Sequence, residues 1–192
     1  MWGDFIKKNL YVDYDNTLVN TIAVICLLYN EDFKYYTKFT PVNWWEVNTW
    51  DFSECTCTNR EYINNYFNQP RFFKNITYMD WAKEILEELK DEYNITIISM
   101  GYTPNLRAKE EWIKENLPFC NFIGVNMKEH SDKSHLDLSD SVFIDDSSTN
   151  LKTSNALVNI CFGESYPWNK DWTGIRCKNW NDIKKFLKGD GE

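Results

Sequence analysis

Three short, largely apolar runs, each followed at once by a polar side chain, constrain the fold of this chain of 192 residues more than any other feature. The runs span residues 10–12, 95–98 and 142–144, and the polar residues that follow them are Asp13, Ser99 and the pair Asp145 and Asp146. Continuous apolar runs of this length are typical of parallel strands that are covered on both faces. Residues 122–125 and 157–160 have the same character, so we expect them to be further strands of the same sheet.

Helical patterns lie between the strand-like runs. An apolar stripe at four-residue spacing marks residues 80–92, a Thr103-Pro104 pair is typical of a helix start, and lysines before Gly189 suit a helix end. Strands that alternate with helices predict an α/β fold with an open, mostly parallel sheet and helices on both faces. Because ligands bind outside the carboxyl ends of the strands in such sheets, we expect the polar residues at the strand ends to converge on one crevice.

Residues 31–79 differ from the rest of the chain because they are rich in aromatic side chains and show no alternation of strands and helices. We therefore expect a small, mainly helical cap inserted at 31–79, with residues 1–30 and 80–192 forming the core domain. Most of the aromatic side chains are expected to pack in the interior of the cap. Trp44 and Trp45 are the best candidates to stack on a planar base instead.

The charge of the chain disfavours some classes of partner. Its formal net charge is -8 and no run of lysines or arginines interrupts it, so a nucleic-acid polymer is not an expected partner. No apolar stretch is long enough to span a membrane, no secretory signal is recognisable, and the six scattered cysteines suit a reducing compartment, so we expect a cytoplasmic protein. A small phosphorylated substrate is compatible with this charge, because a cation and one or two lysines can neutralise a phosphate locally.

The segment Asp13-Tyr14-Asp15-Asn16-Thr17 is a D-x-D-x-T motif directly after the first apolar run. Two carboxylates two residues apart repel each other unless a cation lies between them or one of them carries a proton. A lone D-x-D would also suit a solvated acidic turn, but its position after a strand, in series with the other strand-end groups, favours a reactive site. Asn16 is compatible with a tight turn here, because asparagine tolerates a positive φ.

The order of Asp13, Ser99, Lys133 and the Asp145-Asp146 pair resembles the four sequence motifs of phosphatases of the haloacid dehalogenase superfamily. Receiver domains use similar residue types, but their acidic pair lies in the first strand and their lysine near the end, so the order here argues against them. Within the superfamily, the chain resembles the 5'(3')-deoxyribonucleotidases over most of its length. The segments that carry this resemblance are residues 69–73, 109–117 and 142–146.

The resemblance implies a phosphatase that uses Mg2+ and an aspartyl-phosphate intermediate. Asp13 is the expected nucleophile, and Asp15 is expected to protonate the leaving oxygen and then to activate water. The expected metal ligands are Asp13, the main-chain oxygen of Asp15, and Asp146, with Asp145 orienting the site behind them. The residues expected to bind the substrate or its phosphate are Ser99, Lys133, Thr17 and Trp45, with Lys128 as the substitute if Lys133 points away.

The expected function is hydrolysis of a nucleoside monophosphate, a deoxyribonucleotide first, to the nucleoside and phosphate. Thr21 is a further candidate for the nucleoside pocket by family analogy. Two alternatives stay open: a phosphatase for another small phosphomonoester such as a sugar phosphate, and a catalytically idle member of the superfamily that acts as a binding module. The sequence leaves open the base preference, the 5' or 3' position of the phosphate, and whether the chain forms a homodimer.

Overall fold

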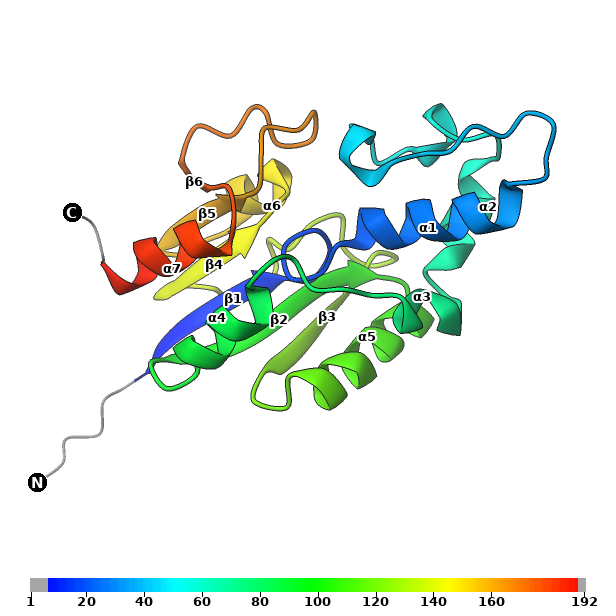
Figure 1. Cartoon of the computed structure of the whole chain (residues 1–192). Coiled ribbons are helices and arrows are strands. Elements are labelled where there is room, and N and C mark those ends of the chain that lie inside the picture. Colours follow the sequence, from blue (N-terminus) through cyan, green and yellow to red (C-terminus); the bar gives the residue numbers. More distant parts are fainter. Residues whose placement is uncertain (1–6, 190–192) are drawn as a thin grey trace, which may run out of the picture.

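The computed structural model describes residues 7–189 and has the expected α/β fold, built on one parallel sheet (Figure 1). The strands run in the order β3-β2-β1-β4-β5-β6, and each pairs in parallel with its neighbours. They are β1 (Lys8–Asp13), β2 (Tyr93–Gly101), β3 (Asn121–Asn126), β4 (Ser141–Asp145), β5 (Val158–Phe162) and β6 (Ile175–Cys177). The first five strands confirm the five that the sequence predicted, whereas the short strand β6 was not predicted.

Strand β1 lies at the centre of the sheet, between β2 and β4. Its last residue, Asp13, pairs with Ile98 of β2. One position earlier, Val12 pairs with Ile144 of β4. This register brings the carboxyl ends of the three strands to the same edge of the sheet, so the polar residues there are neighbours in space although they lie far apart in the chain.

Helices cover both faces of the sheet. The helices of the core domain are α4 (Ala82–Leu89), α5 (Thr103–Asn116), α6 (Ser148–Thr153) and α7 (Trp180–Lys188). Successive strand residues point to opposite faces. On one face Val12 and Ile97 pack with α4, α5 and α7, and on the other Ile98 and Phe143 pack with Leu151 of α6. None of the helices within residues 7–189 is long and apolar enough to cross a lipid bilayer.

The segment between β1 and α4 forms a cap with an interior of its own. Its elements are α1 (Thr21–Phe33), the 3-10 helices η1 (Trp44–Glu46) and η2 (Phe52–Glu54), α2 (Arg60–Tyr66) and α3 (Pro70–Lys74). Buried side chains such as Tyr29, Tyr66 and Phe72 form a cluster separate from the two clusters on the sheet. In Figure 1 the blue and cyan elements of the cap lie beyond the end of β1, to one side of the sheet.

Helix α1 runs through residue 31, where the sequence suggested the start of the cap. All of its buried apolar side chains pack in the apolar cluster of the cap. The two chain segments that join the cap to the core lie side by side, since the main-chain N–H of Met79 donates to the carbonyl of Leu18 over 2.9 Å. We therefore propose that the cap starts at Thr21 and ends near residue 79.

The turn after β1 is held from the interior of the core. Asn16 has the positive φ that was expected, 54°. The turn closes where the main-chain N–H of Leu18 donates to the carbonyl of Asp13 over 3.2 Å. Below it, the indole Nε1 of the fully buried Trp180 donates to the carbonyl of Thr17 over 2.8 Å. This contact ties the D-x-D-x-T segment to helix α7, far away in the sequence.

We expect the substitution Trp180→Phe to lower the free energy of unfolding by about 1–3 kcal/mol, because it leaves the Thr17 carbonyl without its donor in the interior. Urea unfolding followed by circular dichroism measures this change. The matched control is Trp45→Phe, at a side chain that is 66% exposed, for which we expect a change within about 0.5 kcal/mol. Native stability of the Trp180→Phe variant would contradict this role of the indole.

Candidate active site

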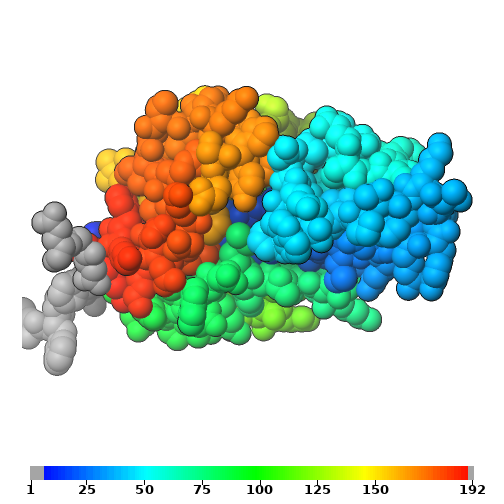
Figure 2. All heavy atoms as spheres, turned by 45° about the horizontal axis from the view of Figure 1, so that its top comes forward, coloured from blue at the N-terminus to red at the C-terminus, as the bar shows by residue number. Residues whose placement is uncertain are grey.

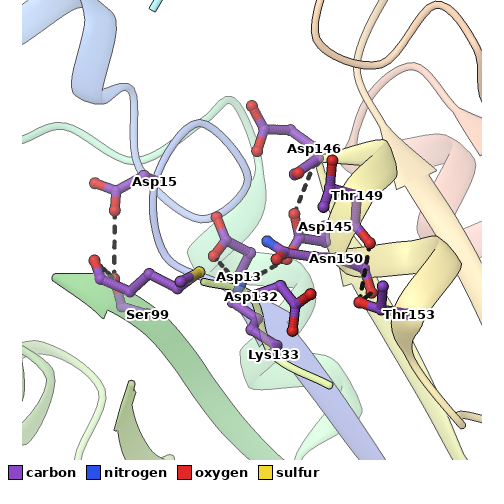
Figure 3. Close-up of polar contacts among 12 residues, drawn as sticks. Asp13, Asp15, Ser99, Asp132, Lys133, Asp145, Asp146, Thr149, Asn150 and Thr153 are labelled. Atoms are coloured by element: carbon purple, nitrogen blue, oxygen red, sulfur yellow. Dashed lines mark hydrogen bonds and ion pairs between the residues drawn. The ribbon is translucent and has the colours of Figure 1, made fainter. Parts of the chain in front are cut away.

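The ends of two adjacent strands, β1 and β4, bring the predicted acidic residues together. Asp13 is the last residue of β1, Asp145 is the last residue of β4, and Asp146 follows it. Ser99 lies on β2, on the other side of β1. Figure 3 shows these side chains gathered at one edge of the sheet. The convergence expected from the sequence is therefore present.

Lys133 joins two of these carboxylates. Its Nζ forms ion pairs with Asp13 Oδ1 and with Asp145 Oδ2, the latter over 2.6 Å, and its side chain is fully buried. Burial would lower the pKa of Lys133, but attraction to the two carboxylates raises it above its ordinary value. The two carboxylates therefore favour the charged form of Lys133, and the exposed Lys128 is not needed in its place.

The carboxylate of Asp145 is fully buried and is held by three partners. It accepts hydrogen bonds from the main-chain N–H of Ser147 over 2.7 Å and from Asn150 Nδ2 over 3.0 Å, in addition to its ion pair with Lys133. The sequence did not predict Asn150 as part of the site. These contacts support the proposal that Asp145 orients the site and holds Lys133 rather than binding a ligand directly.

The carboxylates of Asp13, Asp145 and Asp146 form a compact, buried cluster. One oxygen of each lies within 4.8 Å of the others. Burial raises the pKa of Asp13 to about 7, attraction to Lys133 opposes the shift, and the charges of Asp145 and Asp15 add to it. Burial and the charges of Asp13 and Asp145 also raise the pKa of Asp146 well above its usual range.

This cluster fits a hard divalent cation. Three carboxylates share the single charge of Lys133, so an excess of negative charge is concentrated on oxygen atoms, the ligand type that Mg2+ prefers. Asp13 and Asp146 of the predicted ligand set lie in the cluster. The side chain of Asp15 has other partners, which is compatible with the prediction that only its main-chain oxygen binds the metal.

A second buried lysine contacts Asp15. The Nζ of Lys109, on helix α5, lies 2.5 Å from Asp15 Oδ2 and 2.8 Å from Ser99 Oγ, and the residue is 1% exposed. On its other oxygen Asp15 accepts a hydrogen bond from Thr21 Oγ1 over 2.7 Å. Thr21 was a candidate for the nucleoside pocket, and the structure brings its hydroxyl to Asp15 instead.

Sequence reasoning missed Lys109 because a lysine on an amphipathic helix is usually solvated. One signal could have revealed it. The buried residues of α5 are Asn105, Lys109 and Ile113, which recur at four-residue spacing and so share one helix face. Lys109 shares a helix face with Ile113, a core residue. Because this helix follows the strand that carries Ser99, a lysine on that face points toward the strand rather than toward solvent.

None of the four predicted substrate-binding residues lines the cavity described below. Ser99 and Lys133 bond to Asp15 and Asp13, which do line it, whereas Thr17 and Trp45 lie elsewhere. Thr17 is fully buried, does not line the cavity described below, and its Oγ1 has no hydrogen-bond partner within residues 7–189. Trp45 points outward from η1 and does not line the cavity either, because Val47 takes the buried position of this segment. Trp50 and Phe52, a few residues further along the cap, do line the cavity, and sequence reasoning singled out neither.

A cavity of about 570 Å³ lies over the acidic cluster, between the cap and the core. Its cap side is formed by Trp50, Phe52, Arg60, Asn64, Phe67 and Asn68. Its core side is formed by Asp13, Asp15, Met100, Gly101, Tyr102, Asn105, Lys109, Met127, Asp145, Asp146, Ser147 and Asn150. The cavity thus has an aromatic and amide wall opposite a charged floor. Asn105 joins the two sides, because its Nδ2 donates to the carbonyl of Phe67 over 2.7 Å.

The sequence of the chain matches known proteins over nearly its whole length. The family model described as "5' nucleotidase, deoxy (Pyrimidine), cytosolic type C protein" matches residues 7–189. A 5'(3')-deoxyribonucleotidase of Clostridium acetobutylicum is 26% identical over 182 residues, which cover 95% of this chain and 96% of the relative. A 5'(3')-deoxyribonucleotidase of Bacillus subtilis is 24% identical over 186 residues, 95% of this chain and 99% of the relative.

Solved structures of the haloacid dehalogenase superfamily share the fold. A protein described as a predicted phosphatase from Clostridium acetobutylicum has a TM-score of 0.66 at 12% identity, over 96% of this chain and 100% of that one. A haloacid dehalogenase-like hydrolase from Streptococcus pneumoniae has a TM-score of 0.63 at 16% identity, over 94% and 98%. A hydrolase of the superfamily from Bacillus subtilis, described as bound to magnesium, has a TM-score of 0.55 at 14% identity, over 94% and 98%.

We expect the substitution Asp146→Asn to raise the free energy of unfolding in chelator by about 1 kcal/mol, because it removes one of three crowded carboxylates. We also expect Mg2+ to stabilise the native protein and not this variant. Thermal unfolding with chelator and with increasing Mg2+ measures both effects. The control is Asp91→Asn, in an exposed turn, which should behave as the native protein. Equal stabilisation of the native protein and Asp146→Asn by Mg2+ would contradict the metal site.

Proposed function

Because the chain belongs to the family of cytosolic type C 5' nucleotidases, we propose that it hydrolyses deoxynucleoside monophosphates with Mg2+ and through a phosphorylated Asp13. It is a phosphatase of the haloacid dehalogenase superfamily, of the 5'-nucleotidase type. The observation that carries the proposal is the position of Asp13 on the floor of the cavity, paired with Lys133 and next to the other two carboxylates of the cluster.

Asp13 has the surroundings that a nucleophile for phosphoryl transfer needs. Lys133 opposes the rise in its pKa and so favours the ionised carboxylate. In the proposed first step an oxygen of Asp13 bonds to phosphorus and the bond from phosphorus to the ester oxygen breaks. In the second step water attacks the aspartyl phosphate and restores the carboxylate. Mg2+ held by Asp13, Asp146 and the main-chain oxygen of Asp15 would offset charge on the phosphoryl oxygens.

Asp15 is the proposed general acid and base. It lines the cavity two residues after the nucleophile, and its side chain contacts Lys109 and Thr21 rather than Lys133. It would protonate the departing alcohol and later accept a proton from the attacking water. We propose that Lys109 and Thr21 hold the carboxyl group of Asp15 in place for both transfers, and that Ser99, bonded to Lys109, contacts a phosphate oxygen.

The cap wall of the cavity supports a nucleoside as the leaving group. A volume of about 570 Å³ lies within the range of small-molecule pockets, and Trp50, Phe52 and Phe67 offer aromatic surface on which a base can stack. The charged floor would hold the phosphate at the opposite end. The similarity to two 5'(3')-deoxyribonucleotidases over 95% of the chain favours a deoxynucleotide over a sugar phosphate.

We expect phosphate release from deoxynucleoside monophosphates to require Mg2+ and to fall by at least about 10³-fold in the variant Asp13→Asn. The assay compares 5' and 3' deoxynucleotides, ribonucleotides and sugar phosphates, each with Mg2+ and with chelator. Release from sugar phosphates alone would retain the chemistry and contradict the substrate. Undiminished release by Asp13→Asn would contradict the nucleophile, and no release from any compound would favour the binding-module alternative.

We expect Lys109→Met to lower kcat for a deoxynucleotide by about 10²-fold, because Asp15 loses the cation that fixes its side chain. Circular dichroism of the same variant checks that the fold is retained. Lys128→Met is the matched control, since this lysine is exposed on the segment that follows β3, and its kcat should equal that of the native enzyme. A Lys109→Met variant with native kcat would show that Lys109 does not serve the reaction.

Trp50 and Trp45 of the cap should differ in their effect on substrate binding. We expect Trp50→Ala to raise KM for a deoxynucleotide about tenfold at saturating Mg2+, because a stacked base contributes about 1–3 kcal/mol. Trp45→Ala should leave KM unchanged, since Trp45 lies outside the cavity. Steady-state kinetics of both variants measures the contrast. A larger rise in KM for Trp45→Ala than for Trp50→Ala would contradict this proposal and support the sequence-based prediction for Trp45.

A further inference from the structure

Asp146 has an aromatic hydrogen-bond donor that the proposed reaction does not use. The indole Nε1 of Trp168 donates to Asp146 Oδ2 over 3.0 Å. Trp168 lies in the irregular segment between β5 and β6, more than twenty residues after Asp146. A tryptophan indole has one N–H and no acceptor, so this contact fixes a single oxygen of the carboxylate and leaves the other free.

The residue next to Trp168 holds the main chain of Asp146. The Nδ2 of Asn169 donates to the carbonyl of Asp146 over 3.0 Å, and Asn169 is fully buried. Asn169 is itself fixed, because its own carbonyl accepts a hydrogen bond from Arg176 over 2.9 Å. Two consecutive residues therefore hold Asp146, one at its side chain and one at its backbone.

The indole of Trp168 is fixed on both sides. It stacks on Tyr166, with ring centroids 4.6 Å apart and planes 3° apart, and it packs at a tilt against Trp50 of the cap, with centroids 5.6 Å apart. Figure 2 shows the orange segment that contains Trp168 next to the cyan surface of the cap. Ser148 Oγ also donates to the carbonyl of Trp168 over 3.1 Å. These contacts aim the indole N–H at Asp146.

The donor suits a metal ligand because it orients the carboxylate without neutralising it. Asp13 and Asp145 share the charge of Lys133, whereas within residues 7–189 no lysine, arginine or histidine forms an ion pair with Asp146. We propose that Trp168 is a positioning residue that holds Asp146 Oδ2 and so presents the other carboxylate oxygen to the divalent cation. The proposal rests on the metal site of the proposed function.

The test uses Trp168→Phe, which keeps an aromatic ring between Tyr166 and Trp50 but removes the N–H. We expect the Mg2+ concentration that gives half of the full rise in thermal stability to increase about tenfold or more, as is usual when a partner of a metal ligand is lost. The Mg2+ concentration needed for half-maximal phosphate release should rise in parallel. At saturating Mg2+, kcat should return to within about twofold of the native value, because only metal affinity is impaired.

The matched control is Trp172→Phe in the same segment. Its indole donates to the carbonyl of Ile175 over 2.9 Å and has no hydrogen bond to Asp146, so its Mg2+ dependence should be native. Native Mg2+ dependence of Trp168→Phe, an equal loss in both variants, or a protein that Mg2+ does not stabilise at all would overturn the proposal. If Mg2+ stabilises the protein in a way that depends on Trp168 but deoxynucleotides are not hydrolysed, the role of Trp168 is retained and the proposed substrate is overturned.

Discussion

One buried lysine offsets the repulsion between two buried carboxylates at the carboxyl ends of neighbouring strands. Lys133 pairs with Asp13 and Asp145 at the edge where β1 and β4 end side by side, and both carboxylates are nearly or fully removed from solvent. Removing the cation from a buried carboxylate strongly destabilises the folded state. The fold therefore depends on Lys133 to keep Asp13 and Asp145 buried side by side. Within residues 7–189 the lysine forms no ion pair with the third carboxylate, Asp146. The site therefore retains an excess of negative charge, at a cost in stability that a divalent cation would relieve.

The two acids of the D-x-D motif have different surroundings. Different surroundings allow two carboxyl groups to play different chemical roles in one site. Asp13 pairs with Lys133 and lies among the cluster of carboxylates, whereas Asp15 pairs with Lys109 and Thr21 on the side of helix α5. Each acid thus has its own buried lysine. The aromatic side chains of the cap form the opposite wall of the same cavity, facing the two acids across it.

Local patterns explain which parts of the site were predictable. Lys133 lies in a loop between β3 and β4 that has no pattern of its own, and it was predicted only because the order of the motifs resembles that of haloacid dehalogenase phosphatases. Lys109 was missed because its contact depends on how α5 packs on the sheet, and Trp168 because its segment is irregular and has no periodicity. Sequence reasoning named Trp45 and not Trp50, which lines the cavity, because in a cap built of short turns the sequence does not reveal which aromatic side chain faces the core. The three-residue strand β6 is likewise too short to give a pattern.

The central claim is that Asp13 becomes phosphorylated, and trapping the intermediate tests it most directly. The enzyme would be mixed with a deoxynucleotide and Mg2+, quenched in acid within the first turnover, and digested for mass spectrometry of the peptide that contains Asp13. Reduction with borohydride, which converts an aspartyl phosphate to homoserine, would mark the position. The account predicts a phosphorylated peptide that carries homoserine at position 13 after reduction. Turnover without such a peptide, or with the phosphoryl group on another residue, would contradict it.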